Sequence, residues 1–144
     1  MKKEKILVSA CLLGKPCRYD GKSKPNPAVI ALDEKYETVA VCPECDGGLP
    51  TPRIPSERVG DRVMNAEGAD VSEFYRRGAE IALDIALEQG IRAAVMKARS
   101  PSCGKGCIYD GSFSRRLVER DGVAAELLIK NGISVYTEEE TDKL

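Results

Sequence analysis

Residues 4–11 read "EKILVSAC", in which Glu4 and Lys5 precede an apolar run that is interrupted only by Ser9 and ends at a cysteine. Three further segments have the same near-continuous apolar character: "ETVAVC" at 37–42, "IRAAVMKA" at 91–98 and "ISVYT" at 133–137. Such runs are typical of parallel strands, because both faces of a parallel sheet are covered and neither needs polar residues for water. The pattern predicts four parallel strands, the first over 4–10.

Capping and stop residues mark helices between these strands, at 28–35 after Asn26-Pro27, at 71–89 after Asp70 and at 122–131 after Asp121. In the helix at 71–89 one stripe is expected to face the sheet, formed by Phe74, Gly78, Ile81, Ala82 and Ile85. Strands that alternate with helices are typical of α/β proteins with right-handed crossovers. We therefore expect a single domain over 1–144 with a three-layer, Rossmann-like architecture, in which helices flank an open, mostly parallel sheet of about four strands.

Two segments are too long for ordinary connections. Residues 46–69 are rich in proline and glycine, and residues 99–120 form a second such segment. Long connections in compact domains are usually functional, so both are expected to be functional loops that lie across the domain.

The composition excludes several classes of function. Lys plus Arg number 22 and Asp plus Glu number 23, so the formal charge of −1 provides no field that would favour nucleic acid or an anionic membrane as a partner. The N-terminal apolar run is too short for a signal peptide or a membrane span, and we expect a cytoplasmic protein. In that reducing compartment, six cysteines point to metal ligation or thiol chemistry instead of structural disulfides.

Three cysteines follow the ends of predicted strands. Cys11 follows the first strand, Cys42 closes the second and Cys103 comes shortly after the third. The carboxyl ends of parallel strands share one edge of the sheet, and ligands of open α/β sheets bind outside that edge. We therefore expect these three thiols to lie together.

The chain contains no histidine, so any metal must be held by thiolates or carboxylates. Three thiolates suit an iron–sulfur cubane that keeps one iron without a protein ligand, and this iron acts as a Lewis acid. One alternative is a structural zinc site in a non-enzymatic binding or interaction domain, formed by Cys42, Cys45, Cys103 and Cys107. Another is a thioredoxin-like Cys42-x-x-Cys45 pair, which requires a helix at Cys42, and the "DGGLPTP" that follows argues against this helix.

Long motifs carry a resemblance to a known family. The segments are "VSACLLGKPCRYDGKSK" at 8–24, "VCPECDGGLPTPRIPSE" at 41–57, "KARSPSCGKGCIYDGSF" at 97–113 and "DGVAAELLIKNGISV" at 121–135. They resemble short bacterial proteins long catalogued as a domain of unknown function, some of which are thiouracil desulfidases. The resemblance covers essentially the whole chain.

The resemblance implies a [4Fe-4S] cluster with three cysteine ligands and one open iron, which captures the sulfur of a small thiolated compound such as a thiouracil-like nucleobase. By motif, the ligands fall on Cys11, Cys42 and Cys103. The catalytic acid/base glutamate falls on Glu44 and the serine beside the third ligand on Ser102. The implied reaction is a non-redox C–S cleavage that converts a thiocarbonyl to a carbonyl.

The remaining features receive structural interpretations. Cys17, Cys45 and Cys107 are expected to be spare thiols, and Tyr-Asp-Gly at 19–21 and 109–111 is expected to form two turns. Arg53 is expected to be solvated, with a substrate contact as the alternative. The acidic run 138–140 is expected to be a solvated tail.

Overall fold

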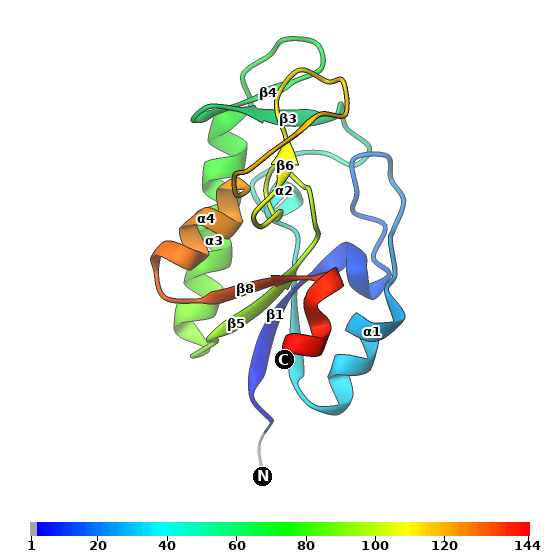
Figure 1. The fold of residues 1–144 in the computed structure, drawn as a ribbon, viewed down its shortest axis with the longest axis vertical. Helices are drawn as coiled ribbons and strands as arrows, with labels where there is room; N and C mark the ends of the chain where they lie inside the picture. Colours follow the sequence, from blue (N-terminus) through cyan, green and yellow to red (C-terminus); the bar gives the residue numbers. More distant parts are fainter. Residues whose placement is uncertain (1–2) are drawn as a thin grey trace.

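The computed structural model describes residues 3–144, and its centre is a parallel sheet with the strand order β2-β1-β5-β8 (Figure 1). The strands are β1 (Lys5–Ser9), β2 (Glu37–Val41), β5 (Ala93–Met96) and β8 (Ser134–Thr137). All three pairings are parallel, with Leu7 opposite both Val39 and Ala94. The prediction of a four-stranded parallel sheet is confirmed.

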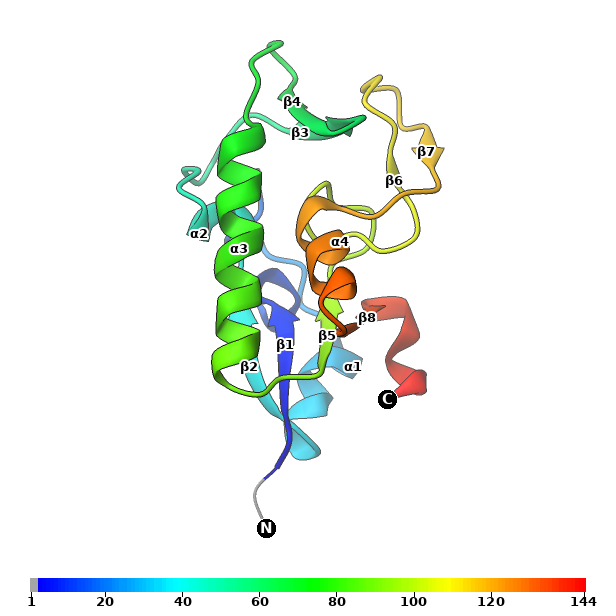
Figure 2. The ribbon, with the colours of Figure 1, turned by 90° about the vertical axis from the view of Figure 1, so that its left-hand side faces the viewer.

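Helices cover both faces of this sheet, as predicted. The helices α3 (Ser72–Glu88) and α4 (Val123–Lys130) lie on one face (Figure 2), and α1 (Pro27–Ile30) lies with the 3-10 helices η1 (Ala10–Leu13), η2 (Ala31–Glu34) and η3 (Glu138–Lys143) on the other. Successive residues of β1 enter different cores, because Leu7 packs with α3 and α4 whereas Ile6 and Val8 pack with Val29 of α1. Two buried faces explain why the strands are apolar without alternation.

The buried stripe of α3 is rotated from the predicted one. Phe74 is exposed, whereas Tyr75, Gly78, Ala79, Ala82 and Ala86 are buried. The small residues of this stripe allow α3 to approach the sheet and the one-turn helix α2 (Pro43–Asp46) closely. Asp70 does not take the N-cap position, which is Val71, although the Asp70 carboxylate accepts a hydrogen bond from the amide of Ser72 at 2.9 Å.

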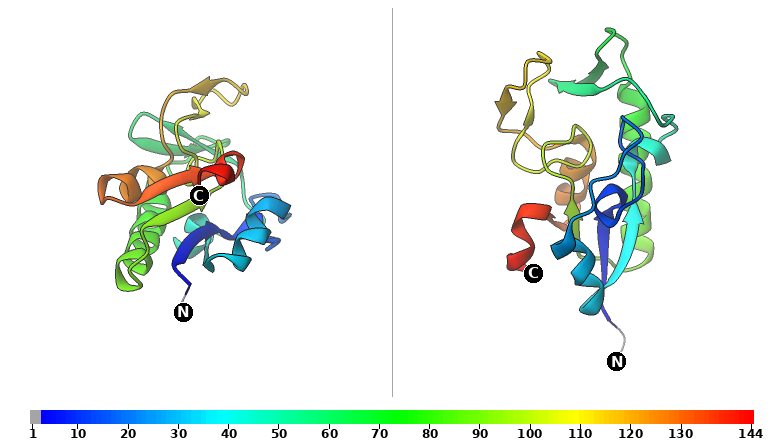
Figure 3. Two further views of the ribbon diagram at one scale, coloured as in Figure 1. Left: turned by 60° about the horizontal axis from the view of Figure 1, so that its bottom comes forward. Right: turned by 90° about the vertical axis from the view of Figure 1, so that its right-hand side faces the viewer.

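The two predicted loops contain hairpins. Residues 46–69 include β3 (Ser56–Val59) and β4 (Arg62–Asn65), joined by Gly60 and Asp61, and residues 99–120 include β6 (Ile108–Tyr109) and β7 (Leu117–Val118). Gly60 has a φ of 60°, which a two-residue hairpin turn requires. Both hairpins lie beyond the carboxyl ends of the strands, at the top of the right-hand view of Figure 3.

The strand order places a topological switch point between β1 and β5. The chain passes from β1 outward to β2 and then crosses to β5 on the other side of β1. Connections from the carboxyl ends of β1 and β5 therefore separate and leave a crevice, where ligands of open α/β sheets bind. Within residues 3–144, no helix is both long and apolar enough to cross a membrane.

Candidate functional site

A cleft of about 540 Å³ opens at the carboxyl ends of β1, β2 and β5. Cys11, Cys42 and Cys103 all line it, so the three thiols that were expected at one sheet edge do meet there. Cys17 also lines the cleft, whereas Cys45 and Cys107 do not. All six cysteines are free thiols.

Cys11 and Cys103 are the most buried of these thiols, with exposed fractions of 8% and 5%. Cys11 lies in η1, which continues directly from β1, and Cys103 lies in the turn after β5. Burial raises the pKa of the Cys11 thiol and that of the Cys103 thiol to about 12 each, and neighbouring thiols add to both shifts. Thiols held together out of water in this way give up their protons readily only to a metal.

Cys42 directly follows β2 and is the N-cap residue of α2. The sequence argued against a helix here, but one turn does form because Pro43 occupies a first-turn position where no amide hydrogen is needed. A contact with Cys17 and then burial raise the pKa of the Cys42 thiol. The turn therefore does not produce the lowered pKa that a thioredoxin-like cysteine requires.

The donors in the cleft fit an iron–sulfur cluster. Three thiols in a chain without histidine, two of them buried and that of Cys42 partly buried, are the ligand type that such clusters take. Among residues 3–144, no group of three or more His, Cys, Asp or Glu could hold a single metal ion. A cubane is larger than one ion and holds its thiolates farther apart, whereas the alternative zinc site would need Cys45 and Cys107 to lie with Cys42 and Cys103.

Glu44 lies on α2 with its two carboxylate oxygens in different environments. Its Oε2 accepts a hydrogen bond from the Ser102 hydroxyl at 2.8 Å, and the Ser100 hydroxyl lies 3.5 Å away. Its Oε1 accepts from Arg53 Nε at 3.1 Å and from Nη2 at 2.9 Å. The carboxylate is thereby held against the cleft wall beside Cys103, whose Sγ lies 3.6 Å from Ser102 Oγ.

Arg53 is not solvated, contrary to the prediction. Its side chain is only 6% exposed and forms the salt bridge to Glu44. It also donates to the carbonyls of Cys17 and Pro50, at 3.1 and 3.2 Å, to the Thr51 hydroxyl at 3.2 Å and to Cys45 Sγ at 3.6 Å. The guanidinium of Arg53 thus connects the catalytic candidate Glu44 to the segments that contain Cys17 and Pro50.

Two site residues were missed from the sequence. The Ser100 hydroxyl accepts hydrogen bonds from the amides of Ser102 and Cys103, at 3.2 and 3.1 Å, so it shapes the turn that carries both. Tyr75 lines the cleft at 1% exposure beside Glu44, and burial raises the pKa of its phenol. The "SPS" at 100–102 is a recognisable turn signal, whereas Tyr75 was hidden by the wrong stripe on α3.

Both Tyr-Asp-Gly segments form the predicted turns. The carboxylate of Asp20 accepts from the amide of Lys22 at 3.0 Å, and that of Asp110 accepts from the amide of Ser112 at 2.9 Å. Gly21 has a φ of 76°, a conformation that glycine adopts without strain. The repeated Tyr-Asp-Gly motif is therefore a repeated turn, which follows Cys11 in one segment and Cys103 in the other.

Comparisons with known proteins agree with this geometry. Residues 6–140 match the model of a family described as 2-thiouracil desulfurase. The uncharacterized protein YbbK of Bacillus subtilis strain 168 is 38% identical over 149 residues, which covers 96% of this chain and 99% of YbbK. The solved structure of the [4Fe-4S]-dependent thiouracil desulfidase TudS is 49% identical, with a TM-score of 0.93 over 99% of this chain and 95% of TudS.

Proposed function

The chain belongs to the 2-thiouracil desulfurase family, and from this premise we propose that it removes sulfur from a small thiolated compound, such as a thiouracil-like nucleobase, at a [4Fe-4S] cluster. Cys11, Cys42 and Cys103 would hold the cluster, with Glu44 as catalytic acid/base and Ser102 beside it. The net reaction converts the thiocarbonyl and one water into a carbonyl and hydrogen sulfide, with no change of oxidation state.

One observation carries the proposal: the three thiols line the same cleft as a carboxylate that lies 2.8 Å from a serine hydroxyl. When bound, the cluster would supply an iron without a protein ligand, a Lewis acid that suits the soft sulfur of a thiocarbonyl. Fluctuating thiols on separate loops could not present such a group reliably. Here Cys103 is fixed by the Ser100 turn and Cys11 by its direct continuation from β1.

The chain's own residues supply the proton transfers. Glu44 Oε2 faces the cleft and would take the proton of the water that attacks the thiocarbonyl carbon. Ser102 donates to this same oxygen, so it orients Oε2 and provides a path for the proton. Arg53 occupies Oε1 and keeps the carboxylate from rotating out of this arrangement.

The proposal is tested by anaerobic reconstitution with iron and sulfide, followed by measurement of bound iron and of sulfide released from 2-thiouracil. Glu44→Gln should retain full iron and lose sulfide release by about 100-fold or more, because it removes general acid/base catalysis without touching a ligand. The matched control is Glu88→Gln on the exposed end of α3, which should behave as the wild type. Full activity of Glu44→Gln would remove Glu44 from the mechanism.

The ligand assignment has its own test. Serine at Cys11, Cys42 or Cys103 should abolish iron binding, whereas serine at Cys17, Cys45 or Cys107 should leave it intact. Loss of iron in the Cys45 or Cys107 variant would favour the four-cysteine alternative. A wild-type chain that binds only zinc would refute the cluster itself.

A further inference from the structure

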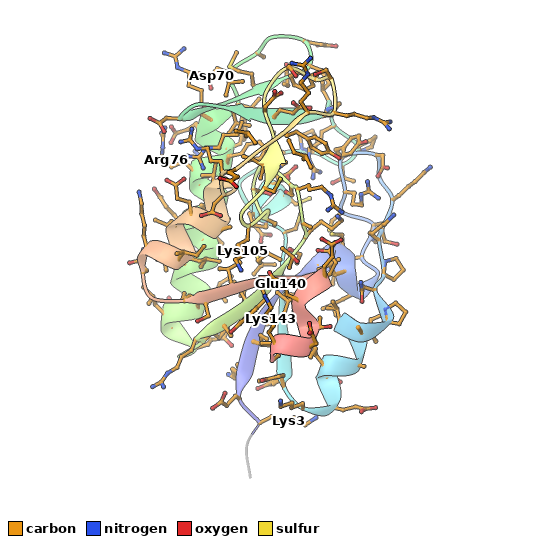
Figure 4. The ribbon with its side chains drawn as sticks, viewed as in Figure 1. Lys3, Asp70, Arg76, Lys105, Glu140 and Lys143 are labelled. Carbon is orange, nitrogen blue, oxygen red and sulfur yellow. The ribbon has the colours of Figure 1, made fainter. Side chains whose placement is uncertain are left out.

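The acidic run after β8 is not a solvated tail, contrary to the prediction. Each of its three glutamates contacts a basic residue in the segment 97–105, which leads from β5 to Cys103 and just beyond it. The ion pairs are Lys97–Glu138 at 3.1 Å, Arg99–Glu139 at 3.4 Å and Lys105–Glu140 at 3.3 Å. Figure 4 shows Lys105, Glu140 and Lys143 gathered at the C-terminal turn. Sequence separation of about forty residues hid this pairing, because the acidic run alone contains no sign of its partners.

Glu138 is the most buried of these three glutamates, with a side chain that is 10% exposed. One carboxylate oxygen accepts a hydrogen bond from the backbone amide of Ala98 at 2.7 Å. The other oxygen lies 3.1 Å from the ammonium of Lys97. Charge-assisted hydrogen bonds of this length are stronger than neutral ones, so Glu138 fixes the backbone as well as a charge.

The backbone just after β5 donates hydrogen bonds to side chains at the ends of both neighbouring strands. Ser9, the last residue of β1, accepts a hydrogen bond from the amide of Lys97 at 2.9 Å. Glu138, the first residue after β8, accepts from the next amide, that of Ala98. The sheet ladder is thus continued beyond the end of β5 by one side chain on each side.

The segment restrained in this way, Lys97 and Ala98, leads directly into the candidate site. Arg99 follows with a φ of 66°, an uncommon conformation for a residue other than glycine, which persists only where the surroundings enforce it. The Ser100 turn comes next and sets the amides of Ser102 and Cys103. A shift at Ala98 would therefore move Ser102 and Cys103 together.

Glu138 also balances a charge beside the thiols. The side chain of Lys97 lines the same cleft as Cys11 and brings a positive charge to it. Its ion pair with Glu138 holds the ammonium at one place on the wall of the cleft. The same ammonium also donates a hydrogen bond to the Ala98 carbonyl at 3.1 Å, so without Glu138 it would keep only this one contact.

We infer that Glu138 is a positioning residue, which fixes the path of the chain from β5 through Ala98 and so determines how firmly Cys103 is presented to the metal cluster. The backbone bond to Ala98 sets the path and the ion pair with Lys97 steadies it. The role of Cys103 as a cluster ligand rests on the proposed function, whereas the effect of Glu138 on the position of Cys103 does not.

The test compares Glu138→Ala and Glu138→Gln with matched Glu88→Ala and Glu88→Gln controls in the full chain. In the reconstituted protein, iron loss to a chelator should be about tenfold faster for Glu138→Ala, which loses both bonds. It should be about threefold faster for Glu138→Gln, whose amide oxygen can still accept from Ala98. In the iron-free chain, iodoacetamide should label Cys103 faster in Glu138→Ala, while labelling of Cys45 on α2 stays unchanged.

Rates for Glu138→Ala equal to those of Glu88→Ala, in both iron loss and Cys103 labelling, would overturn the inference. Equal acceleration at Cys45 and Cys103 would also overturn it, because that would show general loosening of the fold. If Glu138→Ala does not fold, the test rests on Glu138→Gln. Iron loss from Glu138→Gln at the same rate as from Glu88→Gln would then contradict the inference. A wild-type chain that binds iron but releases no sulfide from 2-thiouracil refutes the proposed function alone.

Discussion

Arg53 directs both of its contacts with Glu44 to the same carboxylate oxygen. Nε and Nη2 lie 3.1 and 2.9 Å from Oε1, so Oε2 remains for Ser102 and for a proton from the cleft. A bidentate contact to both oxygens would have occupied the working oxygen as well. The two oxygens of Glu44 therefore have separate tasks, one of orientation and one of chemistry.

We expect Arg53→Met to lower sulfide release by about tenfold to a hundredfold while bound iron stays at the wild-type level, because the change frees Glu44 without removing a thiol. The measurements are bound iron and the initial rate of sulfide release. In the double variant with Glu44→Gln, the loss should equal that of Glu44→Gln alone, since both changes act on one carboxylate. If the loss in the double variant instead equals the product of the two single fold-losses, Arg53 acts elsewhere, for instance on the segments that contain Cys17 and Pro50.

At the scale of elements, the placement of Cys42 and Glu44 depends on the contact between α2 and α3. A Cβ on Gly78 would lie 1.8 Å from the carbonyl oxygen of Pro43, and one on Gly47 would lie 2.0 Å from that of Phe74. Because Cys42 is the N-cap residue of α2, a displacement of α2 would also displace Cys42. Glycine is required at both positions for close approach of the two helices.

Gly78→Ala should destabilise the fold by about 1–3 kcal/mol and reduce bound iron, since α2 must shift and carry Cys42 with it. Thermal unfolding and iron analysis test this expectation. Leu87→Ala, at an exposed position of the same helix, is the control and should keep its iron. Normal iron content in Gly78→Ala would show that α2 tolerates the displacement.

The C-terminal turn η3 makes a pH-dependent contribution to stability. A hydrogen bond from the amide of Thr137 first, and then Lys143 and Lys105, lower the pKa of Glu140 to about 2 from an ordinary value of 4.5. A carboxyl with a depressed pKa stabilises the fold above its unfolded value and loses this contribution as the pH falls toward the folded value. The contribution is therefore complete near pH 7 and declines between about 4.5 and about 2.

Glu140→Gln should lower the free energy of unfolding by about 1 kcal/mol at pH 7, and the difference from the wild type should shrink steadily below pH 4.5. Denaturant unfolding of the iron-free chain between pH 7 and pH 3 measures it. A difference that stays constant over this range would show that the charge of Glu140 does not contribute.

At the scale of the whole molecule, the cleft is separate from the two cores that stabilise the sheet. One core joins the sheet to α3 and α4 and the other joins it to α1, and most of their members are aliphatic side chains far from the thiols in sequence. Of the buried members of these two cores, Cys11, Val41 and Cys103 also line the cleft. The sheet does not depend on a metal for its burial of apolar surface.

Removal of iron by a chelator should therefore leave the far-ultraviolet circular dichroism of the chain essentially unchanged and lower its thermal midpoint, because the cluster binds a preformed fold. Zinc-finger domains behave differently and unfold without metal. Collapse of the helical signal on iron removal would contradict the independence of the two cores from the site.

Predictability from sequence differed between local and long-range features of the molecule. The strands could be predicted because Ile6, Leu7 and Val8 are all apolar, and two covered faces demand this. The face of α3 was misplaced because Phe74 and Tyr75 differ by one position, and packing against α2 selects between them. The hairpins at 56–65 and 108–118 were missed because their strands are short and lie in segments dominated by proline and glycine.

Chain order alone places Cys11, Cys42 and Cys103 after the ends of three strands, and parallel pairing of these strands brings the three residues to one edge of the sheet. The side chains around these cysteines depend on the packing of distant elements: Arg53 contacts Glu44, Tyr75 lies beside Glu44, and Glu138 accepts a hydrogen bond from the backbone just after β5. The difference lies in the distance along the chain over which each interaction acts. Periodicity and capping act within a few residues, whereas the charge and hydrogen-bond partners of these three residues come from elements brought together only when the sheet and its helices pack.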